Sequence, residues 1–275
     1  IQKLQYDDVA NIIQRGGTIL GSARSKAFLT KEGRQQAFEN LSENNIDALL
    51  VIGGDGSFTG ASVLAEEFGV KIMGCPGTID NDLYGTDFTI GFDTALNTVV
   101  EAVDKIRDTA SAHHRLFFVE VMGRDAGFIA LQSGLATGAE EILIPEVRTD
   151  IDSLVEKLKT SKSKFKSSIV IVAEGDDAGG AFEIAESVKL QIPDFDTRVS
   201  ILGHIQRGGS PSAADRLLAT RMGHRAALDL CDHKSGYMVG VKGGELVRVP
   251  LEKAIKEDVS PNTEWLDLLE VLSIY

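Results

Sequence analysis

The sequence predicts an α/β fold with mainly parallel sheets, and three observations support this prediction. Short apolar runs alternate along the chain with stretches of helical periodicity. Such alternation is typical of parallel sheets whose two faces are covered by helices. Glycine-rich loops follow several of the apolar runs, at the strand ends where such sheets bind ligands. The length of 275 residues fits one large domain or two smaller ones.

The first predicted strand, DALLVI (47–52), is short, continuously apolar and bounded by two glycines, which suits burial on both faces. Helices are expected over 60–68 and over 94–108, where apolar residues recur at spacings of three and four. The other predicted strands are VKIMG (70–74), LFFVEV (116–121), EILIP (141–145), SIVIVAEG (168–175), RVSILG (198–203) and YMVGV (237–241). Further helices are expected over 151–160, 181–190 and 212–231, and near the C-terminus in EWLDLLEVL, with Trp265 in the core.

The composition is that of an ordinary globular protein, with 43% hydrophobic and 25% charged residues. A net charge of −13 argues against nucleic acid as a partner, because duplex binding requires clustered Lys and Arg. No apolar run reaches the roughly 18 residues that span a membrane. Cys75 and Cys231 form no C-x-x-C pair, which indicates a reduced, cytoplasmic protein.

The stretch VIGGDGS (51–57) has the pattern of a phosphate-binding loop between a strand and a helix. Its glycines allow backbone N–H groups to approach an anion, and the following helix N-terminus adds positive potential. Asp55 would repel a phosphate directly, so a magnesium ion shared with phosphates is the better role for it. The structural alternative is a tight turn with Asp55 as the helix N-cap.

The stretch GCPGTIDNDLYGTD (74–87) places Asp80 and Asp82 one residue apart on a glycine-bounded loop. An ionised carboxylate accepts a proton from a hydroxyl, and a second one orients that hydroxyl or its neighbour. Lipids, nucleotides and sugars all carry hydroxyls, so the pair does not choose among them. A cluster of Asx turns on a surface loop is the alternative, and residue chemistry alone leaves the two even.

Arginines lie beside strand ends or glycine turns, and guanidinium groups bind phosphate oxygens bidentately. Any one of them is more often a surface ion pair, but six in such settings in an acidic chain favour a phosphate ligand. They are Arg24, Arg107, Arg115, Arg124, Arg198 and Arg207. Glu174 ends a predicted strand and either accepts hydrogen bonds from sugar hydroxyls or caps the neighbouring backbone. The histidines show no metal-ligand spacing, and only His204 is placed in a site.

Together these motifs resemble the bacterial-type 6-phosphofructokinases, in the family's order and over nearly the whole chain. The matching stretches are GSAR (21–24), GGDGS (53–57), PGTIDND (76–82), GFDTA (91–95), VEVMGRDAG (119–127), PEV (145–147) and GHIQRGGSPSAADR (203–216). The resemblance implies two Rossmann-like α/β lobes, each a three-layer sandwich. The ATP-side lobe is expected at about 1–90 and 210–255, and the sugar-phosphate lobe at about 91–209.

The resemblance also implies a cytoplasmic glycolytic kinase that transfers the γ-phosphoryl of Mg·ATP to the 1-hydroxyl of fructose 6-phosphate. Asp80 is then the base, Asp82 and Thr78 position the hydroxyl and the phosphoryl group, and Arg124 stabilises developing charge. ATP and Mg²⁺ are expected at Arg24, Gly54, Asp55, Gly56 and Ser57, with Asp55 as the metal ligand. The implied fructose 6-phosphate site contains Thr78, Asp80, Asp82, Met122, Gly123, Arg124, Glu174, His204 and Arg207, with Arg115 and Arg198 supplied by a neighbouring subunit of a homotetramer.

Two glycines favour ATP over pyrophosphate as the phosphoryl donor. The pyrophosphate-using branch commonly has Asp and Lys at the positions that Gly56 and Gly77 occupy here. A glycine at 56 leaves room for an α-phosphate, and a glycine at 77 supplies no extra cation for pyrophosphate. Pyrophosphate-dependent activity is nevertheless kept as an alternative.

The sequence also departs from the family pattern. About fifty residues that precede Ile1 in the family, with a glycine loop that touches ATP, are absent, so this chain alone is not expected to be a fully active kinase. A catalytically impaired sugar-phosphate-binding subunit is therefore a second alternative. Arg107 and Glu140 match effector residues, but Tyr6 falls where an arginine is common, and Lys162, Lys164 and Lys166 replace a tighter lysine cluster. A relative of the NAD or lipid kinases is disfavoured, because those lack PGTIDND and GHIQRGGSP.

Overall fold

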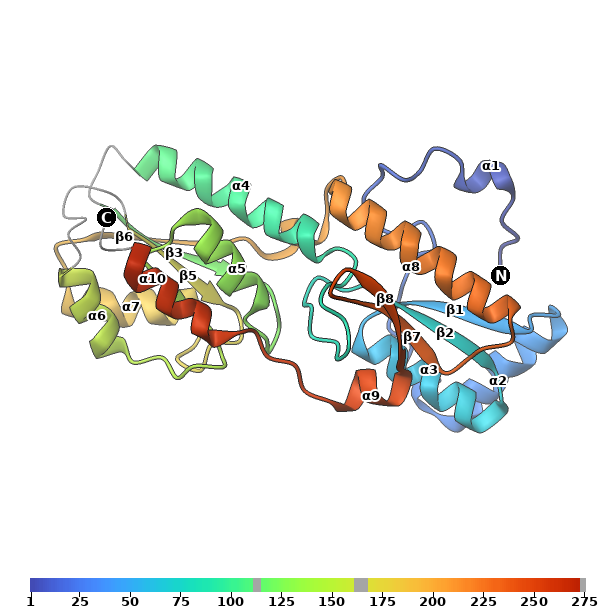
Figure 1. The fold of residues 1–275 in the computed structure, drawn as a ribbon. Coiled ribbons are helices and arrows are strands. Elements are labelled where there is room, and N and C mark those ends of the chain that lie inside the picture. Colours follow the sequence, from blue (N-terminus) through green and yellow to red (C-terminus); the bar gives the residue numbers. More distant parts are fainter. Residues whose placement is uncertain (111–114, 161–167, 273–275) are drawn as a thin grey trace. The chain divides into compact units, whose positions relative to one another are not determined.

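The protein, described by a computed structural model over residues 1–110, 115–160 and 168–272, divides into two compact units (Figure 1). Unit 1 consists of Ile1–Ile79, Leu83–Asp93 and Gly209–Val259. Unit 2 consists of Asp80–Asp82, Thr94–Gly208 and Ser260–Tyr275. Each unit contains a four-stranded sheet in which most neighbouring strands are parallel. The predicted α/β class with mainly parallel sheets is confirmed.

Unit 1 is built on a sheet with strand order β1-β2-β7-β8, in which only β8 runs antiparallel to its neighbour. The strands are β1 (Ala48–Gly53), β2 (Lys71–Pro76), β7 (Tyr237–Lys242) and β8 (Glu245–Pro250). The helical elements are α1 (Tyr6–Val9), η1 (Ala27–Leu29), α2 (Lys31–Glu43), α3 (Asp55–Phe68), α8 (Ala213–Cys231) and α9 (Leu251–Lys256).

The alternation of side chains along the strands gives this sheet two apolar faces. On one face Ile72 and Met238 pack with residues of α3 and α9, such as Phe58. On the other face Met73 and Cys75 pack with residues of α8. Unit 1 is therefore a helix–sheet–helix sandwich of three layers.

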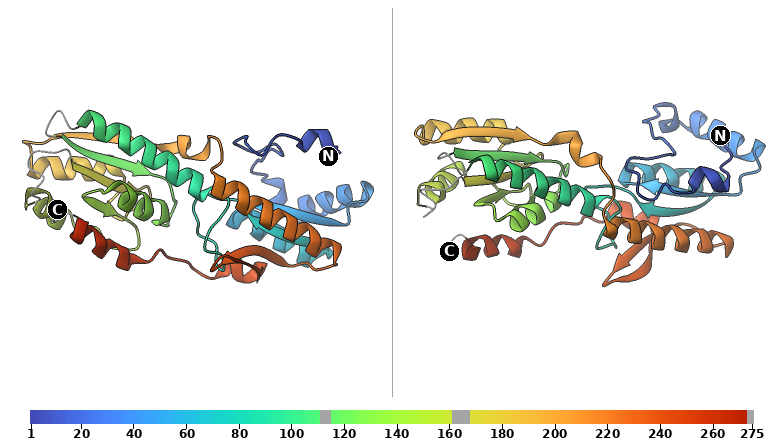
Figure 2. Two further views of the ribbon diagram at one scale, coloured as in Figure 1. Left: turned by 45° about the horizontal axis from the view of Figure 1, so that its top comes forward. Right: turned by 90° about the horizontal axis from the view of Figure 1, so that it is seen from above.

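Unit 2 is built on a fully parallel sheet with strand order β4-β5-β3-β6. The strands are β3 (Arg115–Val121), β4 (Glu141–Leu143), β5 (Ser168–Ala173) and β6 (Asp196–Ile201). The helical elements are α4 (Phe92–Ala110), α5 (Phe128–Thr137), α6 (Ile151–Thr160), α7 (Ala181–Gln191), η2 (Gly203–Arg207), η3 (Thr263–Leu266) and α10 (Asp267–Leu272). Figure 2 shows the helices of this unit on both sides of its sheet.

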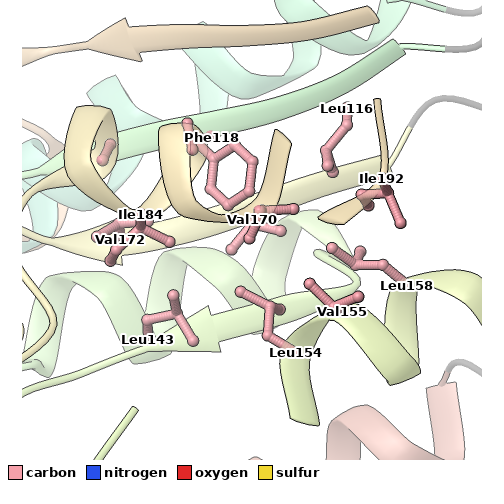
Figure 3. Close-up of a cluster of buried hydrophobic side chains, with 13 residues drawn as sticks. Leu116, Phe118, Leu143, Leu154, Val155, Leu158, Val170, Val172, Ile184 and Ile192 are labelled. Atoms are coloured by element: carbon pink, nitrogen blue, oxygen red, sulfur yellow. The ribbon is translucent and has the colours of Figure 1, made fainter. Parts of the chain in front are cut away.

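The core of unit 2 lies between its sheet and the helices α6 and α7 (Figure 3). Phe118 and Val170 from the strands meet Ile184 from α7, and each fully buried side chain of this size stabilises the fold by roughly 1.5–3 kcal/mol. Helix α5 covers the opposite face, where Gly134 allows close approach. A Cβ atom at Gly134 would lie 2.5 Å from Ile142. Unit 2 therefore also has three layers.

Two details of the prediction are wrong. Helix α3 begins at Asp55, five residues before the expected start, because the glycine-rich stretch itself forms the first turn. Trp265 is 43% exposed and lies in η3 rather than in the core. Helix α10 starts only at Asp267, and its phase turns Leu269, which is 5% exposed, inward instead.

Cys75 is buried and Cys231 exposed, and both are free thiols. Burial raises the pKa of the Cys75 thiol to about 11. Within the ranges that the structure describes, no helix combines the length and apolar character needed to cross a bilayer.

A buried carboxylate in α8 leads to a prediction about stability. Asp229, 2% exposed, accepts hydrogen bonds from Arg248 at 2.6 and 2.8 Å and from Arg225 at 3.2 Å. The Arg248 hydrogen bonds, followed by that from Arg225, hold the pKa of Asp229 well below its usual range. Since the pKa is depressed by folding, this stabilisation is present above the unfolded value of about 3.9 and is lost as the pH falls below it.

Replacing Asp229 by asparagine is expected to lower the free energy of unfolding by about 3 kcal/mol at pH 7, because it leaves two arginines without their counter-charge. The loss should shrink as the pH falls below about 4. Urea denaturation at pH 7 and pH 3.5 measures both effects. Asp232→Asn is the control, because its ion pair with Lys234 is exposed and contributes less than about 1 kcal/mol. Equal losses in the two variants would contradict the prediction.

Candidate functional site

Two of the predicted loops leave the sheet of unit 1 side by side. Strands β1 and β2 are parallel neighbours, and Gly53 at the end of β1 lies opposite Pro76 at the end of β2. The N–H group of Gly77 donates a hydrogen bond of 2.9 Å to the carbonyl of Gly53. A Cβ atom on Gly54 would lie 3.2 Å from the Cβ of Thr78, so the GGDGS stretch and Thr78 are in direct contact.

The GGDGS stretch forms the N-terminus of α3. Gly54 is the N-cap and Asp55 the first helical residue, so the alternative of Asp55 as N-cap is wrong. Gly56 and Ser57 are exposed, and a Cβ atom at Gly56 would meet no atom within 4 Å. The backbone N–H groups of this turn and the helix dipole provide a setting in which an anion is stabilised.

Asp55 fits a magnesium ion that is held mainly by phosphates. Within residues 1–110, 115–160 and 168–272, no three His, Cys, Asp or Glu side chains form a group that could hold a metal ion. Mg²⁺ is typically bound by one or two carboxylates together with water and substrate phosphates, so a single half-buried carboxylate beside a phosphate-binding turn suits it.

The PGTIDND loop follows β2 and holds the two acids predicted to act together. Asp80 is 7% exposed, and Asp82 is partly buried. Between them Asn81 has a φ of 56°, a left-handed conformation that asparagine tolerates better than most residues. The third acid of the stretch, Asp87, has a structural partner, because its carboxylate accepts a hydrogen bond of 2.7 Å from the N–H of Gly243.

A second set of predicted residues gathers in unit 2, at the carboxyl ends of neighbouring strands. The loop 122–127 follows β3 and carries Met122, Gly123 and Arg124, while η2 follows β6 and carries His204 and Arg207. Met122 is 8% exposed, whereas the side chains of Arg124, His204 and Arg207 lie at the surface. Three side chains able to carry positive charge therefore lie at the carboxyl-terminal end of this sheet.

Glu174 follows β5, the neighbour of β3 on the side away from β6, and its side chain binds backbone. Its Oε1 atom accepts hydrogen bonds from the N–H groups of Gly123 at 3.3 Å and Arg124 at 2.8 Å. Of the two roles left open by the sequence, the structure shows the backbone cap through Oε1, and a role toward sugar hydroxyls stays a prediction. Sequence reasoning missed two further side chains that accept hydrogen bonds from N–H groups of the loop 122–127. They are Gln206 and Glu146, which lie inside the motifs GHIQRGG and PEV.

Arg115 and Arg198 lie away from the carboxyl-terminal end of the sheet. Arg115 is the first residue of β3, and the strand's seven residues separate it from Met122 by roughly 20 Å. Arg198 lies on the edge strand β6. Both guanidinium groups contact the carboxylate of Asp196, each at 3.0 Å. The structure thus brings these two arginines together, but apart from the loop 122–127.

The predicted effector residues also meet in unit 2. Arg107 donates hydrogen bonds to the carbonyls of Thr137 at 2.9 Å and Gly138 at 3.0 Å, and it lies 4.0 Å from Glu140. Burial raises the pKa of Glu140, although a hydrogen bond from the Ile169 N–H and the charge of Arg107 oppose the shift. In unit 1, Arg24 and Tyr6 are exposed. Lys162, Lys164 and Lys166 lie outside the described residues.

Comparisons with known proteins identify the family of the chain. The family model described as Phosphofructokinase matches residues 1–230. The chain is 55% identical over 275 residues to ATP-dependent 6-phosphofructokinase 2 of Bacteroides thetaiotaomicron, covering 100% of this chain and 84% of that relative. It is 54% identical over 268 residues to ATP-dependent 6-phosphofructokinase 1 of Thermus thermophilus, covering 97% of this chain and 83% of the relative.

Solved structures show the same fold. Phosphofructokinase from Saccharomyces cerevisiae matches with a TM-score of 0.86 and 36% identity, over 98% of this chain and 39% of that longer chain. A pyrophosphate-dependent phosphofructokinase from Marinobacter aquaeolei matches with a TM-score of 0.80, 24% identity, and 98% and 76% coverage, which shows the fold alone. Since the family model and relatives at over 50% identity each match most of its length, the chain belongs to the phosphofructokinase family.

Proposed function

We propose that the protein transfers the γ-phosphoryl group of Mg·ATP to the 1-hydroxyl of fructose 6-phosphate. The observation that carries the proposal is the 55% identity, over the whole chain, to a bacterial enzyme named for this reaction. The direct contact between GGDGS and Thr78 supports it, because phosphoryl transfer requires the phosphate-binding turn and the acceptor-positioning loop to be neighbours.

In this proposal each loop of unit 1 has one task. Gly54, Gly56, Ser57 and the N-terminus of α3 bind the ATP phosphates, with Arg24 as an added cation. Asp55 holds Mg²⁺, which neutralises charge on the phosphates. Thr78 positions the transferred group. ATP as co-substrate follows from the names of the relatives, whereas Mg²⁺ rests on the donor chemistry of Asp55.

The acids of PGTIDND act on the acceptor. Asp80 takes the proton of the sugar 1-hydroxyl as that oxygen attacks the γ-phosphorus, and Asp82 orients the same hydroxyl. Arg124 offsets the negative charge that develops on the transferred group. Most of the expected rate enhancement comes from this positioning and charge stabilisation.

The sugar phosphate is held by Met122, Gly123, Glu174, His204 and Arg207. Arg115 and Arg198 bind the 6-phosphate of the fructose 6-phosphate that is held in a neighbouring subunit of a homotetramer. The roughly 20 Å length of β3 supports this assignment, since Arg115 cannot reach its own loop 122–127. Arg107 and Glu140 form an effector site for ADP or phosphoenolpyruvate. A cytoplasmic location without nucleic-acid or membrane partners stays a prediction.

The test is a coupled assay on the natural protein that carries this sequence, with ATP or pyrophosphate as donor and fructose 6-phosphate as acceptor. We expect an ATP-dependent rate and little rate with pyrophosphate. Equal rates would support the pyrophosphate-dependent alternative. Binding of fructose 6-phosphate without turnover would support the binding-subunit alternative, and an activity that is flat in ADP and phosphoenolpyruvate would reject the effector site.

Changing Gly56 to aspartate tests the basis for the choice of donor. We expect kcat/KM for ATP to fall about tenfold or more, because a carboxylate at this position repels the α-phosphate. A Cβ atom at 56 would meet no neighbouring atom within 4 Å, so the fold should tolerate the substitution. Gly77 is a poorer choice, since a Cβ atom there would lie 2.9 Å from Ile52.

The matched control is Gly223→Asp, a helical glycine of the same unit that is also open on its Cβ side. It should leave the KM for ATP unchanged. Steady-state kinetics with varied ATP measures both variants, and an unchanged KM and kcat in Gly56→Asp would show that residue 56 does not face the nucleotide.

A further inference from the structure

We propose that Gln206 and Glu146 are positioning residues that set the backbone of the loop 122–127 and thereby place Arg124 for phosphoryl transfer. The inference rests on the proposed function, which gives Arg124 its role. It concerns two side chains that need not touch the substrate themselves.

The loop 122–127 needs support from its surroundings. Arg124 has a φ of 55°, in the left-handed region that costs a residue with a side chain roughly 1–2 kcal/mol, and Gly123 has a φ of 148°. A short internal hydrogen bond of 3.0 Å, from the N–H of Ala126 to the carbonyl of Gly123, is compatible with this turn. Such a conformation persists when neighbouring groups hold it in place.

Three side chains from three neighbouring segments supply that support. The N–H of Met122 donates to Oε1 of Gln206 at 3.2 Å, and the N–H groups of Gly123 and Arg124 donate to Glu174. The N–H of Gly127 donates to Oε1 of Glu146 at 2.9 Å. These acceptors follow β6, β5 and β4 respectively, so each of the other three strands of this sheet is followed by one acceptor for the loop after β3.

Gln206 connects two substrate-binding segments. Its side chain is 1% exposed, and while Oε1 accepts from Met122, Nε2 donates a hydrogen bond of 3.0 Å to the carbonyl of Gly203. The second bond lies within η2, which carries His204 and Arg207. Hydrogen bonds in a buried setting are costly to leave unmade, so a change at 206 should shift the loop relative to η2.

Glu146 fixes the far end of the loop. Gly127, whose N–H it accepts, is the N-cap of α5, and a carboxylate is stabilised at the N-terminus of a helix. A Cβ atom at Gly127 would lie 2.7 Å from Oε2 of Glu146, which shows how tightly the carboxylate is packed against the turn. Oε2 itself is buried and has no hydrogen-bond partner among the residues described.

Both ends of the loop 122–127 are thus held by side chains, Gln206 and Glu146, that take no direct part in the transfer of the phosphoryl group. An arginine displaced by about 1 Å can cost as much as a hundredfold in rate, because phosphoryl transfer depends on geometry. This is the reason to expect a kinetic effect, and not only a loss of stability, when either acceptor is removed.

The experiment compares Gln206→Met, which has similar volume but neither hydrogen bond, with Gln191→Met as the matched control. Gln191 is an exposed glutamine of α7 whose side chain binds Asp152. In the natural protein that carries this sequence, Gln206→Met should lower kcat/KM for fructose 6-phosphate about ten- to a hundredfold while the KM for ATP changes less than about twofold. Gln191→Met should change neither constant.

Glu146 gives a second, independent pair of variants. Glu146→Gln retains an oxygen that accepts from Gly127, so it should keep most of the parental kcat/KM, whereas Glu146→Met should lose about tenfold or more. If Gln206→Met fails to fold, the contrast between these two variants still decides the matter. Equal activity of Glu146→Gln and Glu146→Met, or unchanged kinetics in Gln206→Met, would overturn the proposal.

Hydrogen exchange supplies a readout that does not depend on catalysis. In Gln206→Met, amides of 122–124 should exchange faster by about tenfold or more, while those of β3 stay protected as in the parent. Unchanged exchange in this loop would overturn the proposal even if activity fell. An inactive parent with the predicted exchange pattern would reject the proposed function but leave the positioning role of Gln206 intact.

Discussion

Replacing Asp80 by serine is expected to lower kcat by a factor of about 10²–10⁴, while the KM values for ATP and fructose 6-phosphate change less than about threefold. If Asp80 is the base, as proposed, its removal leaves most of the groups that bind the two substrates in place, so the loss should fall on the chemical step. The residue is 7% exposed, and the smaller serine fits the same space. A coupled assay of ADP release measures the effect.

The control for Asp80→Ser is Asp87→Ser, an acid seven residues further along whose carboxylate binds the Gly243 N–H. That variant should retain the parental kcat, even if its melting temperature falls by a few degrees. A parental kcat in Asp80→Ser would show that this carboxylate is not the base. Equal losses in both variants would point to general disturbance of the loop.

Replacing Arg115 by serine is expected to raise the KM for fructose 6-phosphate about ten- to a hundredfold, since a charge-assisted guanidinium–phosphate contact is lost. The KM for ATP should stay within about twofold. The more telling result comes from mixing. Subunits of Arg115→Ser and Asp80→Ser, each of low activity, should regain activity when they are dissociated together and reassembled.

The reason is the place of Arg115 in the fold, at the opposite end of β3 from Met122. If Asp80 of one subunit works with Arg115 of another, random mixing restores both groups in about a quarter of the sites. If one subunit supplied both, no mixed site would be intact. Activity in the mixture that equals the average of the two separate variants would therefore contradict a shared site, whereas about a quarter of the parental rate would support it.

Of the described strands, all but β8 could be predicted from the sequence, because continuous apolar runs ended by glycines leave few other structures possible. The strand DALLVI and the helix 151–160 were located to within a residue. Strand order was beyond reach, since a run such as YMVGV carries no signal that β7 will lie beside β2. Trp265 was misplaced because the phase of a six-residue helix depends on where it begins.

The chemical groups of the candidate site were predicted from the sequence, but the hydrogen bonds that position the loops carrying them were not. Asp80 and Arg124 stand out because their residue types match a reaction. Gln206 does not stand out, because an amide beside a histidine and an arginine in GHIQRGG reads as one more polar residue. Its role depends on a contact with Met122, which is 84 residues away in sequence. Only the fold shows that Oε1 of Gln206 lies 3.2 Å from the backbone nitrogen of Met122.

The discontinuity of unit 1 has a consequence for how the protein is made. Its central strand β2 pairs with β7 through Met73 and Tyr237, so the sheet cannot be completed until the ribosome has synthesised nearly all of unit 2. Until then β2 presents an unpaired edge, which is a hazard for aggregation. Unit 2, whose four strands all come from 94–208, can close its sheet first. Synthesis rate and chaperone supply should therefore affect the yield of unit 1 more strongly than that of unit 2.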